Sequence, residues 1–215
     1  MDSSSIVLLH GFASSARSTK ARYLAEKTKG VPGVRLHAFD MNPTPADFAY
    51  LTTTGAINRL RQYVLDQDLD MFHLVGSSFG GLIAAHYARR HGGVSRMLLL
   101  APTLRWQSDR FSDEQVAQWQ ETGTVPIAHY AFGEELPLRF GFYEDGQRYR
   151  AFVPPAVPTL IVHGSDDEVV PVEDSRQYAG DHPAQVALIE VEAGHDLNGH
   201  LDFIWSQVHA FLLAG

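Results

Sequence analysis

The chain has 215 residues, of which 45% are hydrophobic and 20% are charged, a composition typical of one compact domain with a sizeable core. Its formal net charge is −8. This charge argues against nucleic-acid and anionic membrane partners, because both need a basic face. The sequence contains no cysteine, which excludes disulfides, thiolate catalysis and zinc–thiolate or iron–sulfur sites.

The N-terminal segment has no basic region before its first apolar run, residues 6–9, and that run is too short for a signal-peptide core. No stretch approaches the roughly 18 apolar residues that a membrane-spanning helix needs. We therefore expect a soluble cytoplasmic protein.

Short apolar runs alternate with helical patterns along most of the chain. In chain order we expect a strand at 6–10, a helix at 18–29, a strand at 34–39, a helix at 55–67, a strand at 71–76, a helix at 79–91, strands at 96–101 and 159–163, a helix at 172–179, a strand at 185–191 and a helix at 200–213. Several strands are apolar on both faces, as in parallel sheets that helices cover on both sides. The pattern predicts an α/β fold with about six mainly parallel strands.

Residues 104–150 interrupt this alternation. The segment is rich in aromatic residues, and Ser112 begins a predicted helix of about three turns. An insertion of this length between core strands is usually functional or disordered, and its aromatic content favours a packed cap. We expect residues 1–215 to form one domain, with residues 104–150 as a cap within it.

The strongest local motif is Gly76-Ser77-Ser78-Phe79-Gly80-Gly81, which fits G-x-S-x-G between a predicted strand and a predicted helix. Such a turn holds the central serine in a strained conformation with its hydroxyl exposed, so Ser78 is the candidate nucleophile. An ordinary glycine-rich turn is the alternative. The lysine of a phosphate-binding loop is absent, and no G-x-G-x-x-G follows a strand, so we expect no dinucleotide cofactor.

The first predicted strand runs into His10-Gly11-Phe12, where serine hydrolases place one wall of an oxyanion hole. The backbone N–H groups of Phe12 and Phe79 are the candidate donors to a tetrahedral oxyanion. The alternative is a glycine turn with a half-buried His10.

A serine nucleophile needs a base and an acid that orients the base. Among eleven histidines, His195 stands out because it follows a glycine between the last strand and the last helix. His200 and His209 fit a helix surface, and we expect His163 to cap its turn. The adjacent residues Asp166, Asp167 and Glu168 all follow a strand, and their chemistry alone does not separate them as the acid.

Taken together, these segments resemble the α/β-hydrolase superfamily along nearly the whole chain. The His-Gly loop, the serine turn, the segment His163-Gly164-Ser165-Asp166-Asp167 and the Gly194-His195 pair occur in the family's order. The resemblance implies Asp167 as the acid, because it lies three residues after Gly164. The loop after the first strand is also similar to the small bacterial esterases of the YqiA type. We expect a minimal α/β-hydrolase fold that lacks two leading antiparallel strands.

The predicted function is that of a serine hydrolase acting on carboxylic esters, with thioesters also open, through Ser78, His195 and Asp167 and without a metal or organic cofactor. The aromatic cap suggests a small to medium apolar ester as the small-molecule partner. Five arginines are candidate anion ligands, although each fits solvated surface charge better: Arg105, Arg110, Arg139, Arg148 and Arg150. A carbon–carbon bond hydrolase, a perhydrolase and a non-catalytic ligand-binding protein remain alternatives on the same fold. The sequence does not predict the oligomeric state.

Overall fold

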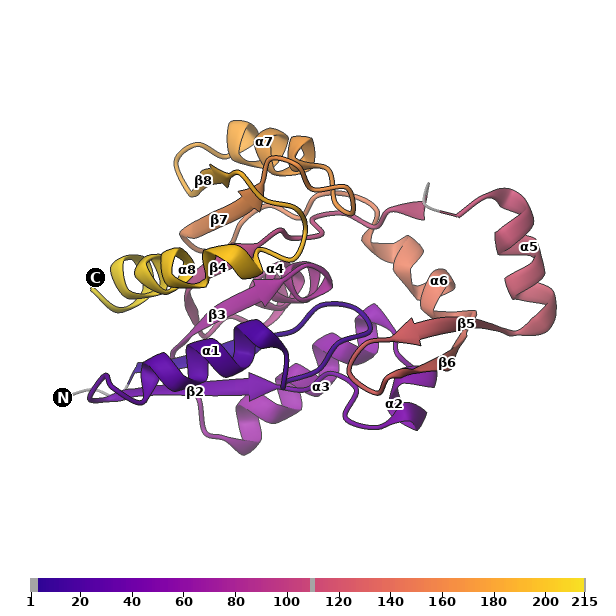
Figure 1. Cartoon of the computed structure of the whole chain (residues 1–215), viewed down its shortest axis with the longest axis horizontal. Helices are drawn as coiled ribbons and strands as arrows, with labels where there is room; N and C mark the ends of the chain where they lie inside the picture. The colour runs from indigo at the N-terminus through magenta and orange to yellow at the C-terminus, as the bar shows by residue number, and fades with distance from the viewer. Residues whose placement is uncertain (1–3, 109–110, 215) are drawn as a thin grey trace.

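A computed structural model describes residues 4–108 and 111–214 (Figure 1). Six strands form one sheet in the order β2-β1-β3-β4-β7-β8, and every neighbouring pair is parallel. This confirms the predicted mainly parallel sheet. The strands are β1 (Ser4–Leu9), β2 (Val34–Phe39), β3 (Phe72–Ser77), β4 (Val94–Leu100), β7 (Thr159–Gly164) and β8 (Val186–Val191).

Helices cover both faces of this sheet, as Figure 1 shows. The α-helices are α1 (Thr19–Thr28), α2 (Pro45–Ala49), α3 (Thr53–Asp66), α4 (Phe79–His91), α5 (Asp113–Thr122), α6 (Gly141–Gly146), α7 (Val172–Asp181) and α8 (Leu201–Gln207). A π-helical segment at Val208–Leu213 continues α8, so the predicted last helix changes its hydrogen-bonding pattern near its end. The predicted bounds of α4 are confirmed at both ends.

Alternating residues of the strands feed two hydrophobic cores. Val7 and Leu9 of β1 lie in the core under α3 and α4, whereas Ile6 and Leu8 lie in the core under α1 and α8. All four side chains are at most 2% exposed. Because side chains alternate along a strand, a sheet covered on both faces must be apolar at consecutive positions.

Between β4 and β7, the described residues include the helices α5 and α6 and a hairpin. The predicted helix after Ser112 is confirmed as α5, and a capping box between Ser112 and Gln115 begins it. The strands β5 (Thr124–His129) and β6 (Glu134–Arg139) pair antiparallel, and no strand was expected there. Pro126 lies opposite Pro137 in this hairpin, and proline lacks the N–H that a central strand needs, which hides the strand in the sequence.

Because the six strands of the main sheet are parallel, their carboxyl ends meet at one edge. The loops that follow β1, β3, β7 and β8 carry Phe12, Ser78, Asp167 and His195 respectively. Segments far apart in the sequence therefore converge at this edge, which is where open α/β sheets bind their ligands. Within the described ranges, no helix is long and apolar enough to cross a membrane.

Candidate active site

Ser78 occupies a strained turn between β3 and α4. Its backbone has φ 52° and ψ −120°, a region that L-residues rarely adopt and that costs of the order of 1–3 kcal/mol. Two hydrogen bonds hold it there: the Ser78 N–H donates to the carbonyl of Leu100 at the end of β4 (2.9 Å), and the N–H of Thr103 in the loop after β4 donates to the Ser78 carbonyl (3.0 Å). The Ser78 side chain does not cap α4, so its hydroxyl is available to another partner.

Two glycines let this turn pack against its neighbours. A Cβ atom on Gly76 would lie 2.7 Å from the carbonyl oxygen of Gly80. A Cβ atom on Gly80 would contact the carbonyl oxygen of Leu9 and would lie 2.6 Å from that of His10. Both clashes involve backbone, which cannot rotate away. A larger residue at Gly80 would push the serine turn off β1, and one at Gly76 would push the end of β3 away from the start of α4.

His195 lies between Ser78 and Asp167. Its Nε2 is 2.9 Å from Ser78 Oγ, and its Nδ1 is 2.8 Å from Asp167 Oδ2. A carboxylate only accepts hydrogen bonds, so Nδ1 carries the proton and Nε2 has the free lone pair. That tautomer accepts a hydrogen bond from the serine hydroxyl, which is the arrangement a general base needs.

Asp167 is a buried carboxylate held by several donors. Its side chain is 0% exposed, and Oδ1 accepts hydrogen bonds from the N–H groups of Val169 and Val170, each at 2.8 Å. Burial raises the pKa of Asp167, but hydrogen bonds from His163, His195 and Val170 outweigh it and hold the pKa well below its usual range. The carboxylate therefore stays ionised beside His195.

The neighbours of Asp167 do not share this position. Asp166 and Glu168 are exposed, and no hydrogen bond from the side chain of either one reaches His195. Of the three adjacent acids that the sequence leaves open, the structure brings only Asp167 against the imidazole.

His163 contacts the acid, a role that the sequence did not predict. It is 0% exposed, and its Nε2 lies 3.1 Å from Asp167 Oδ2 and 3.0 Å from the Val170 carbonyl oxygen. Both partners are acceptors, so Nε2 carries a proton and Nδ1 accepts from the Ser175 hydroxyl at 2.7 Å. His163 does tie its own turn through Val170, as expected, but it also supports the acid. Its place at the end of β7, four residues before Asp167, was the available signal.

The backbone N–H groups of Phe12 and Phe79 have no hydrogen-bond acceptor among the described residues. Phe79 is the first residue of α4, where the N–H has no intrahelical partner. The rings of Phe12 and Phe79 pack edge to face, with their centroids 6.3 Å apart. The ring centroid of Phe142, in α6, lies 5.2 Å from that of Phe12. The segment between β4 and β7 thus packs directly on both candidate donors.

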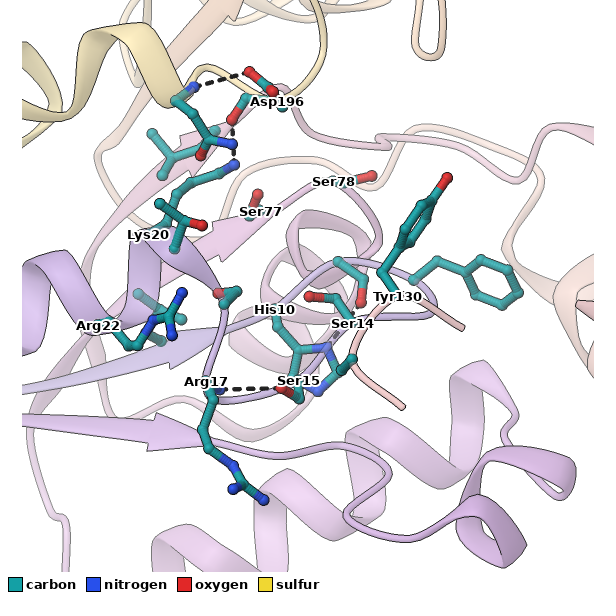
Figure 2. Close-up of a pocket in the computed structure, with 18 of the residues that line it drawn as sticks. His10, Ser14, Ser15, Arg17, Lys20, Arg22, Ser77, Ser78, Tyr130 and Asp196 are labelled. Carbon is teal, nitrogen blue, oxygen red and sulfur yellow. Dashed lines mark hydrogen bonds between the residues drawn. The ribbon is translucent and has the colours of Figure 1, made fainter. Parts of the chain in front are cut away.

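A cavity of about 860 Å³ opens beside Ser78 and His195 (Figure 2). Its apolar wall includes Phe12, Tyr130, Phe132 and Val169, with Tyr130 87% exposed at the tip of the β5–β6 hairpin. Arg110 lies outside the described residues, and none of the other four candidate anion-binding arginines lines this cavity. Arg105 pairs instead with Asp174, Arg148 with Asp145, and Arg139 contacts Tyr50.

Metal-ligating side chains do not gather in this part of the molecule. Over residues 4–108 and 111–214 there is no group of three or more histidine, aspartate or glutamate side chains that fits a metal ion.

Comparisons with known proteins agree with this architecture. The chain is 26% identical over 212 residues to the monoacylglycerol lipase abhd6-B of Xenopus laevis, an alignment that covers 93% of this chain and 58% of the relative. The chain therefore spans little more than half the length of that relative. A putative hydrolase from Agrobacterium vitis S4 superposes with a TM-score of 0.83 at 25% identity, over 97% of this chain and 87% of that one.

A monoacylglycerol lipase from Paleococcus ferrophilus superposes with a TM-score of 0.76 at 17% identity, over 99% of this chain and 96% of that one. These likenesses confirm the predicted α/β-hydrolase fold. The model of one family, described as "Uncharacterised protein family (UPF0227)", matches residues 5–212. Because this match spans nearly the whole chain, the protein belongs to the UPF0227 family of α/β hydrolases.

Proposed function

We propose that the protein hydrolyses carboxylic esters through an acyl-enzyme intermediate on Ser78. The observation that carries the proposal is the unbroken hydrogen-bond chain from Ser78 Oγ through His195 to Asp167 Oδ2. The strained turn at Ser78 adds support, because it keeps the hydroxyl free for a partner other than its own helix. The likeness to a monoacylglycerol lipase of Xenopus laevis points to the same bond type.

In the first half of the reaction, His195 Nε2 takes the hydroxyl proton as Ser78 Oγ attacks the ester carbonyl. The N–H groups of Phe12 and Phe79 donate to the oxyanion that develops, and the loss of one such donor typically costs about 10²–10³ in rate. Collapse of the tetrahedral intermediate breaks the bond to the alcohol oxygen. His195 returns the proton to that oxygen, and the alcohol leaves.

In the second half, His195 deprotonates a water molecule that attacks the acyl carbon. The same two N–H groups hold the second oxyanion, and the proton returns to Ser78 Oγ as the carboxylic acid leaves. Asp167 accepts the hydrogen bond from His195 Nδ1 throughout. Its depressed pKa keeps it negative, so it stabilises the imidazolium without taking the proton.

Labelling with a fluorophosphonate probe tests the nucleophile directly. We expect one adduct on the intact protein, located at Ser78 by peptide mapping, and loss of p-nitrophenyl butyrate hydrolysis in step with labelling. Ser78→Ala and His195→Asn should both abolish hydrolysis. The matched controls are Ser206→Ala and His209→Asn, which change exposed residues near the end of the chain. An unlabelled folded protein, or turnover that survives Ser78→Ala, contradicts the proposal.

A further inference from the structure

The cavity beside Ser78 carries more positive than negative charge, although the whole chain has a net charge of −8. Three basic residues of the loop after β1 and the start of α1 line it: Arg17, Lys20 and Arg22. Two carboxylates line the same cavity, those of Asp40 and Asp196. The local excess of positive charge is opposite in sign to the average for the molecule.

The carboxylate of Asp40 is already occupied by neighbours other than these cations. Its Oδ1 lies 3.2 Å from His10 Nε2 and accepts from the Asn42 N–H at 3.1 Å. Its Oδ2 accepts from the Ala16 N–H at 3.1 Å. Asp40 therefore holds the loop after β1 in place and does not pair with any of the three basic residues.

Lys20 is the innermost of the three. Its ammonium donates to the backbone carbonyl of Asp196, the residue after His195, and in Figure 2 it extends along the side of the cavity that carries Ser77 and Ser78. It forms no ion pair with any residue in the described part of the chain, and an ammonium has three donors. Burial lowers the pKa of Lys20, and the charge of Asp196 partly opposes that shift. A partly desolvated cation attracts an anion more strongly than one in bulk water.

Arg17 and Arg22 lie farther from Ser78 in the same view, and both are exposed. Neither guanidinium has a carboxylate partner over the described ranges, in contrast to Arg59, Arg105 and Arg176. Surface cations at the rim of a cleft raise the local concentration of anions, an effect that salt screens.

We infer that the ester cleaved at Ser78 carries a carboxylate or phosphate group, which Lys20 binds inside the cavity while Arg17 and Arg22 attract it from the rim. This inference rests on the proposed function and narrows its substrate class. The cations come from the loop after β1 and from α1, whereas Arg105, Arg139, Arg148 and Arg150 of the segment 104–150 do not line this cavity.

Two matched substrate pairs test the inference and show which side of the ester bears the anion. The acyl side is tested with mono-p-nitrophenyl adipate against p-nitrophenyl hexanoate. The alcohol side is tested with butanoylglycerol 3-phosphate against monobutanoylglycerol. We expect kcat/KM for the anionic member to exceed that of the neutral member by about tenfold in at least one pair, the size of one charge-assisted hydrogen bond. The advantage should shrink as salt rises from about 0.01 to 0.5 M. Equal or lower kcat/KM for both anionic esters overturns the inference.

Lys20 variants separate anion binding from support of the loop that follows His195. Lys20→Gln should lower the ratio of anionic to neutral kcat/KM about tenfold, and Lys20→Arg should retain most of it because the charge remains. If Lys20 only anchors Asp196, Lys20→Gln lowers both rates by one factor and leaves the ratio unchanged, which contradicts the inference. The matched control is Lys29→Gln at the far end of α1, where Lys29 pairs with Glu26 outside the cavity.

Failure of the inference differs visibly from failure of the proposed function. If neutral esters are cleaved through Ser78 but anionic ones have no advantage, only the inference fails. If no ester is cleaved, calorimetry still tests the anion site. Glycerol 3-phosphate and adipate should bind the wild type more tightly than glycerol and hexanol. That difference should disappear in Lys20→Gln. Absence of any difference in the wild type rejects the anion site independently of turnover.

Discussion

His163 Nε2 lies 3.1 Å from Asp167 Oδ2, the same oxygen atom that accepts a hydrogen bond from His195. The side chains of His163 and Asp167 are both 0% exposed, so water cannot replace either one as the hydrogen-bond partner of the other. His163 is fixed in turn by Ser175 on α7, at 2.7 Å. A second histidine thus positions the acid of the candidate active site. The chain of contacts that ends at Ser78 begins at Ser175 of α7.

Replacement of His163 by phenylalanine should keep the buried ring but remove the donor to Asp167. We expect kcat to fall about tenfold with little change in KM, because a hydrogen bond to a charged group contributes about 1.5–3 kcal/mol and acts on the orientation of His195 rather than on substrate contact. Steady-state kinetics on p-nitrophenyl butyrate measure this.

His73→Phe in β3 is the matched control, since His73 Nδ1 is buried without a hydrogen-bond partner among the described residues. It should leave kcat unchanged. If His163→Phe raises KM and leaves kcat alone, His163 does not act through Asp167.

The choice among the three adjacent acids predicts a sharp difference in rate. Asp167→Asn should lower kcat by about 10³–10⁴, because an amide no longer holds His195 in the tautomer that accepts the serine proton. Asp166→Asn and Glu168→Gln change exposed side chains and should leave kcat within about twofold of the wild type. Comparable losses in all three variants would mean that the loop charge, rather than the Asp167 contact, supports activity.

Stability should depend on pH through Asp167. Its pKa is depressed in the folded protein and returns to about 3.9 in the unfolded chain, so the unfolded state takes up protons first as the pH falls. The stabilisation is fully present above about pH 5 and is lost progressively below pH 4. Urea unfolding at intervals from pH 7 to pH 3 should therefore show wild type and Asp167→Asn converging as the pH falls. Curves that stay parallel over this range contradict the assignment, and Asp166→Asn serves as the control.

The sequence was sufficient to predict the sheet, most helices and the pairing of Ser78 with His195. Parallel strands bring their carboxyl ends to one edge, so chain order alone places Ser78 and His195 near each other. The acid was not separable in this way, because Asp166 and Asp167 differ only in which of them faces inward. That difference depends on a backbone turn, held by the Val169 and Val170 N–H groups, which residue types do not encode.

Two features were not predictable for different physical reasons. The β5–β6 hairpin pairs proline with proline, and proline argues against a strand in a sequence. The cationic wall of the cavity depends on a contact between Lys20, at the start of α1, and the carbonyl of Asp196, which lies 176 residues away in the sequence. Local patterns carry no information about a tertiary contact of this length, so the sequence did not indicate Lys20 as an anion ligand.

The hydroxyl of Tyr149 should help to hold residues 141–149 against α3 and α4. It lies 2.7 Å from Thr54 Oγ1 and accepts from Arg90 at 3.1 Å, while Thr54 donates to Asp145 at 2.6 Å. Tyr149→Phe removes the partner of the half-buried Thr54 hydroxyl and of the exposed Arg90 guanidinium, and should lower the free energy of unfolding by about 1 kcal/mol. Hydrogen exchange over residues 141–149 should accelerate.

Tyr143→Phe is the matched control, because its hydroxyl has no hydrogen bond to any other described residue and its contacts are those of its ring. An equal loss of stability in both variants would assign the effect to ring packing.

Gly80 should be the least replaceable glycine of the serine turn. A methyl group there would meet the carbonyl oxygens of Leu9 and His10, which belong to the strand and loop that lead to Phe12. Gly80→Ala must therefore displace either the turn or that loop, and we expect the free energy of unfolding to fall by about 1–3 kcal/mol, the typical cost of overpacking a core. Where the variant still folds, kcat should fall while Ser78, His195 and Asp167 are all intact, because the Phe12 N–H moves from its position.

The matched control is Gly180→Ala in the exposed part of α7. A Cβ atom there meets nothing within 4 Å, and the substitution should stabilise the protein by about 0.5–1 kcal/mol. Thermal unfolding of both variants and the wild type measures the two effects: the melting temperature should fall in Gly80→Ala and rise in Gly180→Ala. An unchanged melting temperature with full activity in Gly80→Ala would show that the turn accommodates a methyl group at this position, contrary to the clash described above.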